Sequence, residues 1–70
     1  MYYRIKNHIF RLPSVITAET DWANGGPAIL INLTGSKYVT TIVFHTYEER
    51  DKAFDTLCEK LAQYKEETWQ

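Results

Sequence analysis

Residues 46–64 read TYEERDKAFDTLCEKLAQY, and this stretch predicts the one long helix of the chain. It opens with a capping box, in which the Thr46 hydroxyl accepts a hydrogen bond from the Glu49 amide and the Glu49 side chain reaches back to Thr46. Apolar residues then recur at helical spacing, uninterrupted by Gly or Pro. They are Tyr47, Ala53, Phe54, Leu57, Cys58, Leu61 and Tyr64. We expect a helix over residues 47–65 that packs this stripe against the core.

The residues before this helix alternate as short β-strands do, with turn signals between them. The predicted strands cover residues 2–6, 9–12, 14–22, 28–33 and 37–45. Short connections favour antiparallel pairing of neighbouring strands, which gives a meander. The chain is accordingly predicted to be a single α+β domain over residues 1–70. It has an antiparallel sheet of four to five short strands and one C-terminal amphipathic helix packed on one sheet face.

Size and cysteine content predict self-association. The chain has 70 residues, a net charge of −1 and one cysteine, Cys58. Domains this small often need a disulfide, a metal or self-association for stability. One cysteine allows no internal disulfide, and one Cys with two separated His gives no metal-ligand spacing. We therefore expect a homodimer or higher homo-oligomer without metal or cofactor. The lone cysteine, with no pattern typical of a signal peptide or membrane span, predicts a cytoplasmic protein.

Charge is distributed unevenly along the chain. Residues 1–18 hold three basic residues and no acid, whereas residues 46–70 hold seven acids against four bases. One interpretation is a solvated acidic helix beside a mildly basic sheet edge. The other is a dipolar surface that orients a partner.

No arrangement typical of a catalytic site is found. Cys58 lies on the apolar stripe, where we expect a small buried hydrophobe rather than a nucleophile. Residues 25–27, Gly-Gly-Pro, lack the lysine and the following helix of a phosphate-binding loop. Two histidines, His8 and His45, form no recognisable triad with other residues. The chain is predicted not to be an enzyme.

Ten aromatic residues exceed what one helix on one sheet needs to bury. Four of them lie near chain ends or loop edges: Tyr2, Tyr3, Trp22 and Trp69. They either cover the edges of a small core or anchor an interface, for which Tyr and Trp are favoured. If the helix covers one sheet face, the other is the natural self-association surface. Its predicted members are Ile16, Ala18, Leu30, Val39 and Val43.

Two further binding modes involve the basic residues. The segment Tyr2–Arg11 interleaves aromatic residues with Arg4, Lys6 and Arg11, as single-strand-binding sheets do. Strands followed by a helix also resemble, in element order, a family of transcriptional coactivators that dimerise and bind single-stranded DNA. Alternatively, a small anionic ligand binds at an oligomer interface, neutralised by Lys37, His45 or the N-terminal basic residues.

Most of the chain resembles a pattern of small bacterial and phage proteins, in which short strands and a Gly-turn hairpin precede a helix. Residues 9–15, 35–37 and 44–50 carry this resemblance, which implies a fold and no functional residue. The leading hypothesis is a small non-enzymatic module, a homo-oligomer that binds a protein partner. Inhibition of a host or defence protein would fit such a module by analogy alone.

Overall fold

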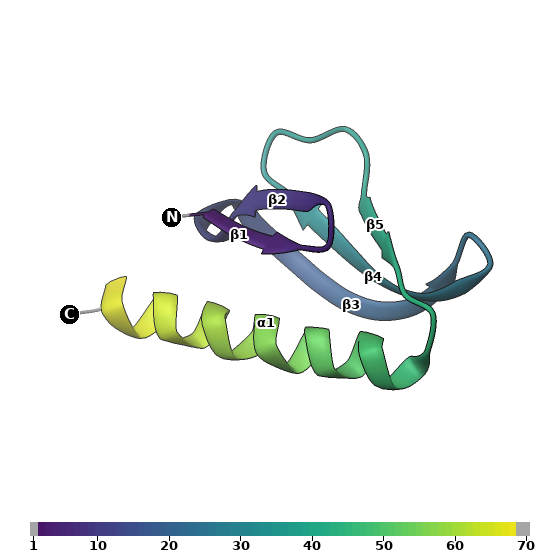
Figure 1. Ribbon diagram of the computed structural model, residues 1–70. Coiled ribbons are helices and arrows are strands. Elements are labelled where there is room, and N and C mark those ends of the chain that lie inside the picture. The colour runs from purple at the N-terminus through teal and green to yellow at the C-terminus, as the bar shows by residue number, and fades with distance from the viewer. Residues whose placement is uncertain (1, 69–70) are drawn as a thin grey trace.

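Five strands precede one helix in the computed structural model, which describes residues 2–68, with side chains through Tyr64 (Figure 1). The elements are β1 (Tyr2–Ile5), β2 (His8–Arg11), β3 (Val15–Ala23), β4 (Gly26–Leu33), β5 (Thr40–Val43) and α1 (Tyr47–Thr68). A 3₁₀ turn, η1 (Leu12–Ser14), links β2 to β3. The predicted α+β class, the strand number and the C-terminal helix are confirmed. No helix in the described part of the chain is long and apolar enough to cross a membrane.

The strands form two antiparallel sheets. The first is the β1–β2 hairpin, and the second has the order β3-β4-β5. The break between the two sheets falls at η1. Pro13 in this turn has no N–H to donate to a neighbouring strand, and its ring fixes its φ angle. The same turn directs Leu12 into the core, where it is 5% exposed. Consecutive strands therefore pair as expected everywhere except between β2 and β3.

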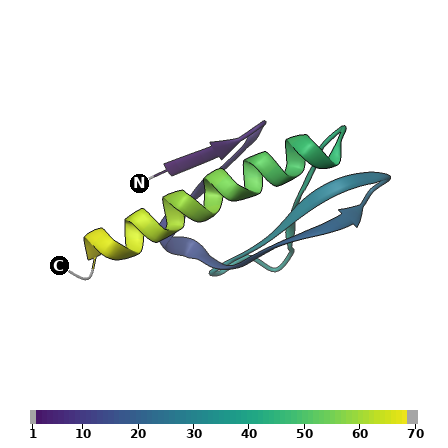
Figure 2. The same cartoon turned by 90° about the horizontal axis from the view of Figure 1, so that it is seen from below.

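The hairpin and the helix pack on the same face of the three-stranded sheet. In the view from below, α1 crosses the picture between the hairpin and the sheet (Figure 2). Ile29 and Ile31 of β4, Ile42 of β5 and Leu57 of α1 are fully buried at the centre. The hairpin adds Ile5 and Phe10 to this core, whose other buried members are Leu12 and Phe44. One apolar cluster thus holds all three pieces together.

The start of α1 follows the sequence signal. The Glu49 amide donates to the Thr46 Oγ1 at 3.1 Å, which confirms the Thr46 half of the capping box. Glu48 and Glu49 lie in the first turn, where the helix dipole favours negative charge. The helix ends at Thr68, three residues beyond the predicted end.

The apolar stripe of α1 is narrower than predicted. Leu57 lies at its centre, with Ala53, Phe54, Leu61 and Tyr64 packed against the core. Cys58 is exposed, so its prediction as a small buried hydrophobe is wrong. Successive helical residues are rotated by about 100°, and a helix covered on one side by a small sheet buries Leu57 but not its neighbour.

The predicted apolar surface on the second sheet face does not form. Ala18 pairs with Ile31 and packs on the core side, while Ile16 falls in the irregular part of the β3 register. Val39 precedes β5 and lies outside the sheet. Leu30 and Val43 remain on the open face, but their β3 and β5 neighbours there are polar: Thr17, Glu19, Asp21 and Thr41.

Candidate interaction site

Two exposed aromatic rings meet where the end of β3 faces the first turn of α1. Trp22 and Tyr47 are 56% and 54% exposed, and their ring centroids lie 6.0 Å apart at an interplanar angle of 40°. Trp22 is placed by a tight β3–β4 hairpin, in which Asn24 and Gly25 both have positive φ. This pattern is typical of a two-residue type I′ turn, which fixes the strand register. We call Trp22, Tyr47 and the adjoining Arg50 the Trp22 patch.

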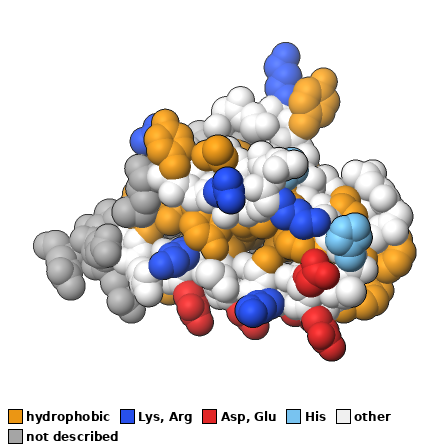
Figure 3. Space-filling view, in the orientation of Figure 1, with side chains coloured by type: hydrophobic (Ala, Val, Ile, Leu, Met, Phe, Trp, Pro, Cys, Tyr) orange, Lys and Arg blue, Asp and Glu red, His pale blue; other side chains and the backbone are white. Residues whose placement is uncertain are grey.

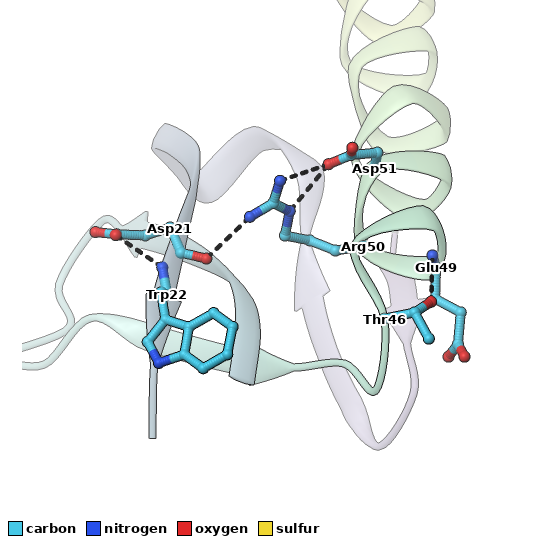
Figure 4. A network of polar contacts seen from close by, with 6 residues as sticks. All are labelled: Asp21, Trp22, Thr46, Glu49, Arg50 and Asp51. Carbon is cyan, nitrogen blue, oxygen red and sulfur yellow. Dashed lines mark hydrogen bonds and ion pairs between the residues drawn. The ribbon is translucent and has the colours of Figure 1, made fainter. Parts of the chain in front are cut away.

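Arg50 ties the two elements of this patch together (Figure 4). Its Nη1 donates to the Asp21 carbonyl at 3.2 Å, and its Nε and Nη2 donate to Asp51 Oδ1 at 2.9 and 2.8 Å. The guanidinium carbon also lies 4.9 Å from the Tyr47 ring centroid. With its side chain only 14% exposed, Arg50 is fixed before any partner arrives. A preordered site loses less side-chain entropy on binding than a mobile one.

The surroundings of the Trp22 patch are acidic. Asp21 precedes Trp22 in β3, and its Oδ1 accepts from the Trp22 amide at 2.7 Å. Glu48 and Glu49 occupy the first helical turn beside Tyr47. The Glu19 side chain, by contrast, lies on the face of β3 opposite to Trp22 and is not part of these surroundings. The patch is therefore an aromatic surface with one immobilised cation and a negative rim.

Residues of the N-terminal hairpin divide between two faces. The register pairs Tyr2 with Arg11 and Arg4 with Ile9 on the outer face, so the basic residues lie beside one exposed aromatic ring. In the space-filling view, basic side chains lie over the hairpin, whereas acidic and basic side chains alternate along the helix (Figure 3). Lys6 is engaged elsewhere: its Nζ donates to the Val43 carbonyl at 2.8 Å and lies 4.9 Å from the Phe44 ring centroid.

Tyr3 and Phe10 face inward from the same hairpin. Their rings meet edge to face with centroids 6.0 Å apart, and Phe10 is 5% exposed. Neither ring is presented to solvent in the manner that stacking on a nucleic-acid base requires. The segment predicted to bind single strands thus exposes one aromatic ring, Tyr2, instead of three.

The pH dependence of stability is expected to report on the burial of Tyr3. Burial, and secondarily the negative charge of Glu59, raise the pKa of the Tyr3 hydroxyl above its ordinary value of 10.0. Above pH 10 the unfolded chain then loses this proton before the folded protein does. The free energy of unfolding is therefore unaffected by this group below pH 10 and decreases as the pH rises through the raised pKa.

Urea unfolding measured from about pH 8 to about pH 11 tests this linkage. Tyr3→Phe should flatten the alkaline decrease, whereas Tyr2→Phe, at a 72% exposed position, should leave it in place. Equal slopes for both variants would assign the effect to another group.

Lys37 and His45, two other predicted site residues, lie in different connections of the fold. Lys37 lies in the loop before β5 and His45 in the connection after it, so β5 separates them. Both are exposed. Trp69 lies outside the described residues. The structure therefore does not bring Lys37 and His45 together as an anion site.

Metal coordination has no evident centre in the part of the chain that the structure describes. No three of its His, Cys, Asp and Glu side chains are grouped so that they could hold an ion.

Sequence reasoning identified Trp22 and missed Tyr47 and Arg50. Tyr47 matched the apolar stripe, but it follows the N-cap directly and is 54% exposed. A bulky aromatic residue at the first position of a helix, followed three residues later by arginine, was the available signal.

Comparison with protein-family models, curated proteins and solved structures finds no match. The candidate site is therefore defined by the geometry of the Trp22 patch.

Proposed function

We propose that this chain is a non-enzymatic binding module that docks on a partner protein through the Trp22 patch. The observation that carries the proposal is the exposed Trp22–Tyr47 pair, stiffened by Arg50. Trp, Tyr and Arg are the residue types enriched at the energetic centres of protein interfaces. Contact of two large, more than half exposed rings with water is unfavourable, and their burial against a partner would remove that contact.

Single-stranded nucleic-acid binding ranks below protein binding. Its support was the row of aromatic residues in the N-terminal segment, and two of these, Tyr3 and Phe10, pack on each other at the core. Arg4 and Arg11 remain exposed on the outer face of the hairpin and would give only a weak, salt-sensitive attraction to phosphate. Binding of a small anion through Lys37 and His45 ranks lower still, because β5 lies between them.

The test compares Trp22→Ala with Tyr38→Ala, a control that removes an 83% exposed ring from the β4–β5 loop. Native mass spectrometry first determines whether the partner is a second copy of the chain. Affinity enrichment from cells of the source organism, quantified against both variants, then identifies a different protein.

Trp22→Ala is expected to weaken the complex by about 30-fold or more, as loss of an interface hot spot does. Tyr38→Ala should leave the affinity unchanged. Equal binding by both variants would contradict the proposal. A chain that neither associates with itself nor retains any protein would do the same.

A further inference from the structure

The outer edge of β3 pairs with no strand in the described part of the chain. β3 spans nine residues and lies at the end of the sheet order β3-β4-β5. The opposite edge, β5, spans only four residues, and the Lys6 ammonium occupies its Val43 carbonyl. A long, unpaired edge strand is a template for another extended chain.

The register identifies which backbone groups of β3 are open. The Phe44 amide donates to the Pro27 carbonyl at 2.7 Å, so these two residues form a hydrogen-bonded pair. Bonded and non-bonded pairs alternate along an antiparallel ladder. Because the Pro27 carbonyl is bonded on the β5 side, the backbone groups of the next residue, Ala28, point toward β3, where its partner is Asp21. The backbone groups of Asp21 therefore point toward β4. Those of Ala18, Thr20 and Trp22 point away from it.

One of the outward groups is already satisfied. The Trp22 amide donates to the Asp21 carboxylate, which closes the edge at that end. The outward amides and carbonyls of Ala18 and Thr20 remain beside it. This short stretch leads directly to the Trp22 patch, so a strand added there would pass next to the Trp22 ring.

The side chains of β3 determine what kind of strand fits. Glu19 and Asp21 share the open face of the sheet, and both are exposed. β3 carries no Lys or Pro, the residues that commonly protect an edge. In an added strand, the residues opposite Glu19 and Asp21 lie about 5 Å away and two positions apart. Lysine or arginine at alternate positions would match both carboxylates.

A second copy of this chain supplies no such strand. β3 has no basic residue of its own, and pairing two copies about Thr20 would place Glu19 of one opposite Asp21 of the other. Arg4 and Lys6 have the required spacing, but β1 ends at Ile5, and Lys6 lies in a turn with a φ of 54°. We propose that the β3 edge accepts an extended segment of a different protein that carries Lys or Arg at alternate positions. This inference rests on the proposed function and specifies the partner.

The experiment titrates the isotope-labelled full chain with a synthetic peptide of alternating lysine and valine and records amide chemical shifts. We expect saturable shifts at Ala18 and Thr20 that a peptide of alternating glutamate and valine does not produce. The double variant Glu19→Lys/Asp21→Lys should bind the glutamate–valine peptide about tenfold or more tightly than the lysine–valine peptide. The matched variant Asp55→Lys/Glu59→Lys, on exposed positions of α1 away from the Trp22 patch, should retain the original preference.

Thr20→Pro provides an independent block of the edge. The Thr20 amide points away from β4, so proline there removes an outward donor and leaves the β3–β4 ladder intact. We expect it to abolish the peptide shifts in a protein that remains folded. Should Thr20→Pro misfold, the charge-reversal pair still decides the question.

Three results would overturn the inference: no shift at millimolar peptide, equal shifts with both peptides, or shifts confined to the β1–β2 hairpin. Edge pairing between two copies without peptide, seen as a doubled native mass that Thr20→Pro abolishes, would also overturn it. The proposed function is judged separately. If Trp22→Ala weakens the natural partner and Thr20→Pro does not, the patch stands and the edge inference fails.

Discussion

Replacing Leu57 by alanine is expected to lower the free energy of unfolding by about 2–5 kcal/mol. Leu57 is fully buried and is the residue through which α1 reaches the centre of the core. A domain of this length has a total stability of roughly 4–10 kcal/mol. The variant should therefore lose about 10–30 °C in Tm. Urea titration followed by far-UV circular dichroism measures the change.

Cys58→Ala is the matched control, because it removes a side chain from the neighbouring, exposed position of the same helix. Its effect should stay within about 0.5 kcal/mol. A comparable loss for both variants would place Cys58 in the core, as the sequence pattern suggested, and would contradict the observed rotation of α1. The pair thus tests the orientation of the helix as well as the depth of its packing.

Local signals predicted the elements of this fold well. The Thr46 cap depends on a side chain and an amide three residues apart, so the sequence alone locates the start of α1. Alternation and turn residues located the strands, because each depends on a few neighbouring positions. The Asn24-Gly25 turn that joins β3 and β4 lies in the gap between the predicted strands 14–22 and 28–33.

Features set by tertiary packing were not accessible in the same way. Pro13 indicated that a strand stops, but the division into two sheets depends on Leu12 turning into the core. The position of Cys58 depends on how much of the helix one small sheet covers. The register irregularity between Val15 and Thr17 moves Ile16 out of the expected alternation. No local residue pattern predicts this irregularity.

The candidate site shows the same division. Trp22 was identified because a bulky aromatic residue beside a turn has little room to be buried. Its partnership with Tyr47 and Arg50 joins residues more than twenty positions apart, and only the packed structure brings them together. The hairpin aromatics show the converse: alternation assigns Tyr2 and Tyr3 to opposite faces, but the contact between Tyr3 and Phe10 needed the β1–β2 register.

Phe10→Ala is expected to cost about 3–5 kcal/mol, because it leaves a cavity between the hairpin and the sheet. Phe10 is 5% exposed and, with Ile5, fastens the hairpin to the core. A two-stranded hairpin is marginal on its own. Its detachment should therefore precede global unfolding, and hydrogen exchange should show lost protection of the β1 and β2 amides before those of β4.

Ile9→Ala provides the control, since Ile9 adjoins Phe10 in sequence, is 65% exposed and lies on the opposite face of the hairpin. It should change stability by less than about 0.5 kcal/mol. The comparison also bears on function, because a Phe10 that stacked on nucleic-acid bases would be dispensable for folding. An unaltered unfolding free energy in Phe10→Ala, combined with lost binding of single-stranded DNA, would contradict the packed hairpin and favour the nucleic-acid hypothesis. Loss of hairpin protection in Phe10→Ala alone would assign this ring to the core.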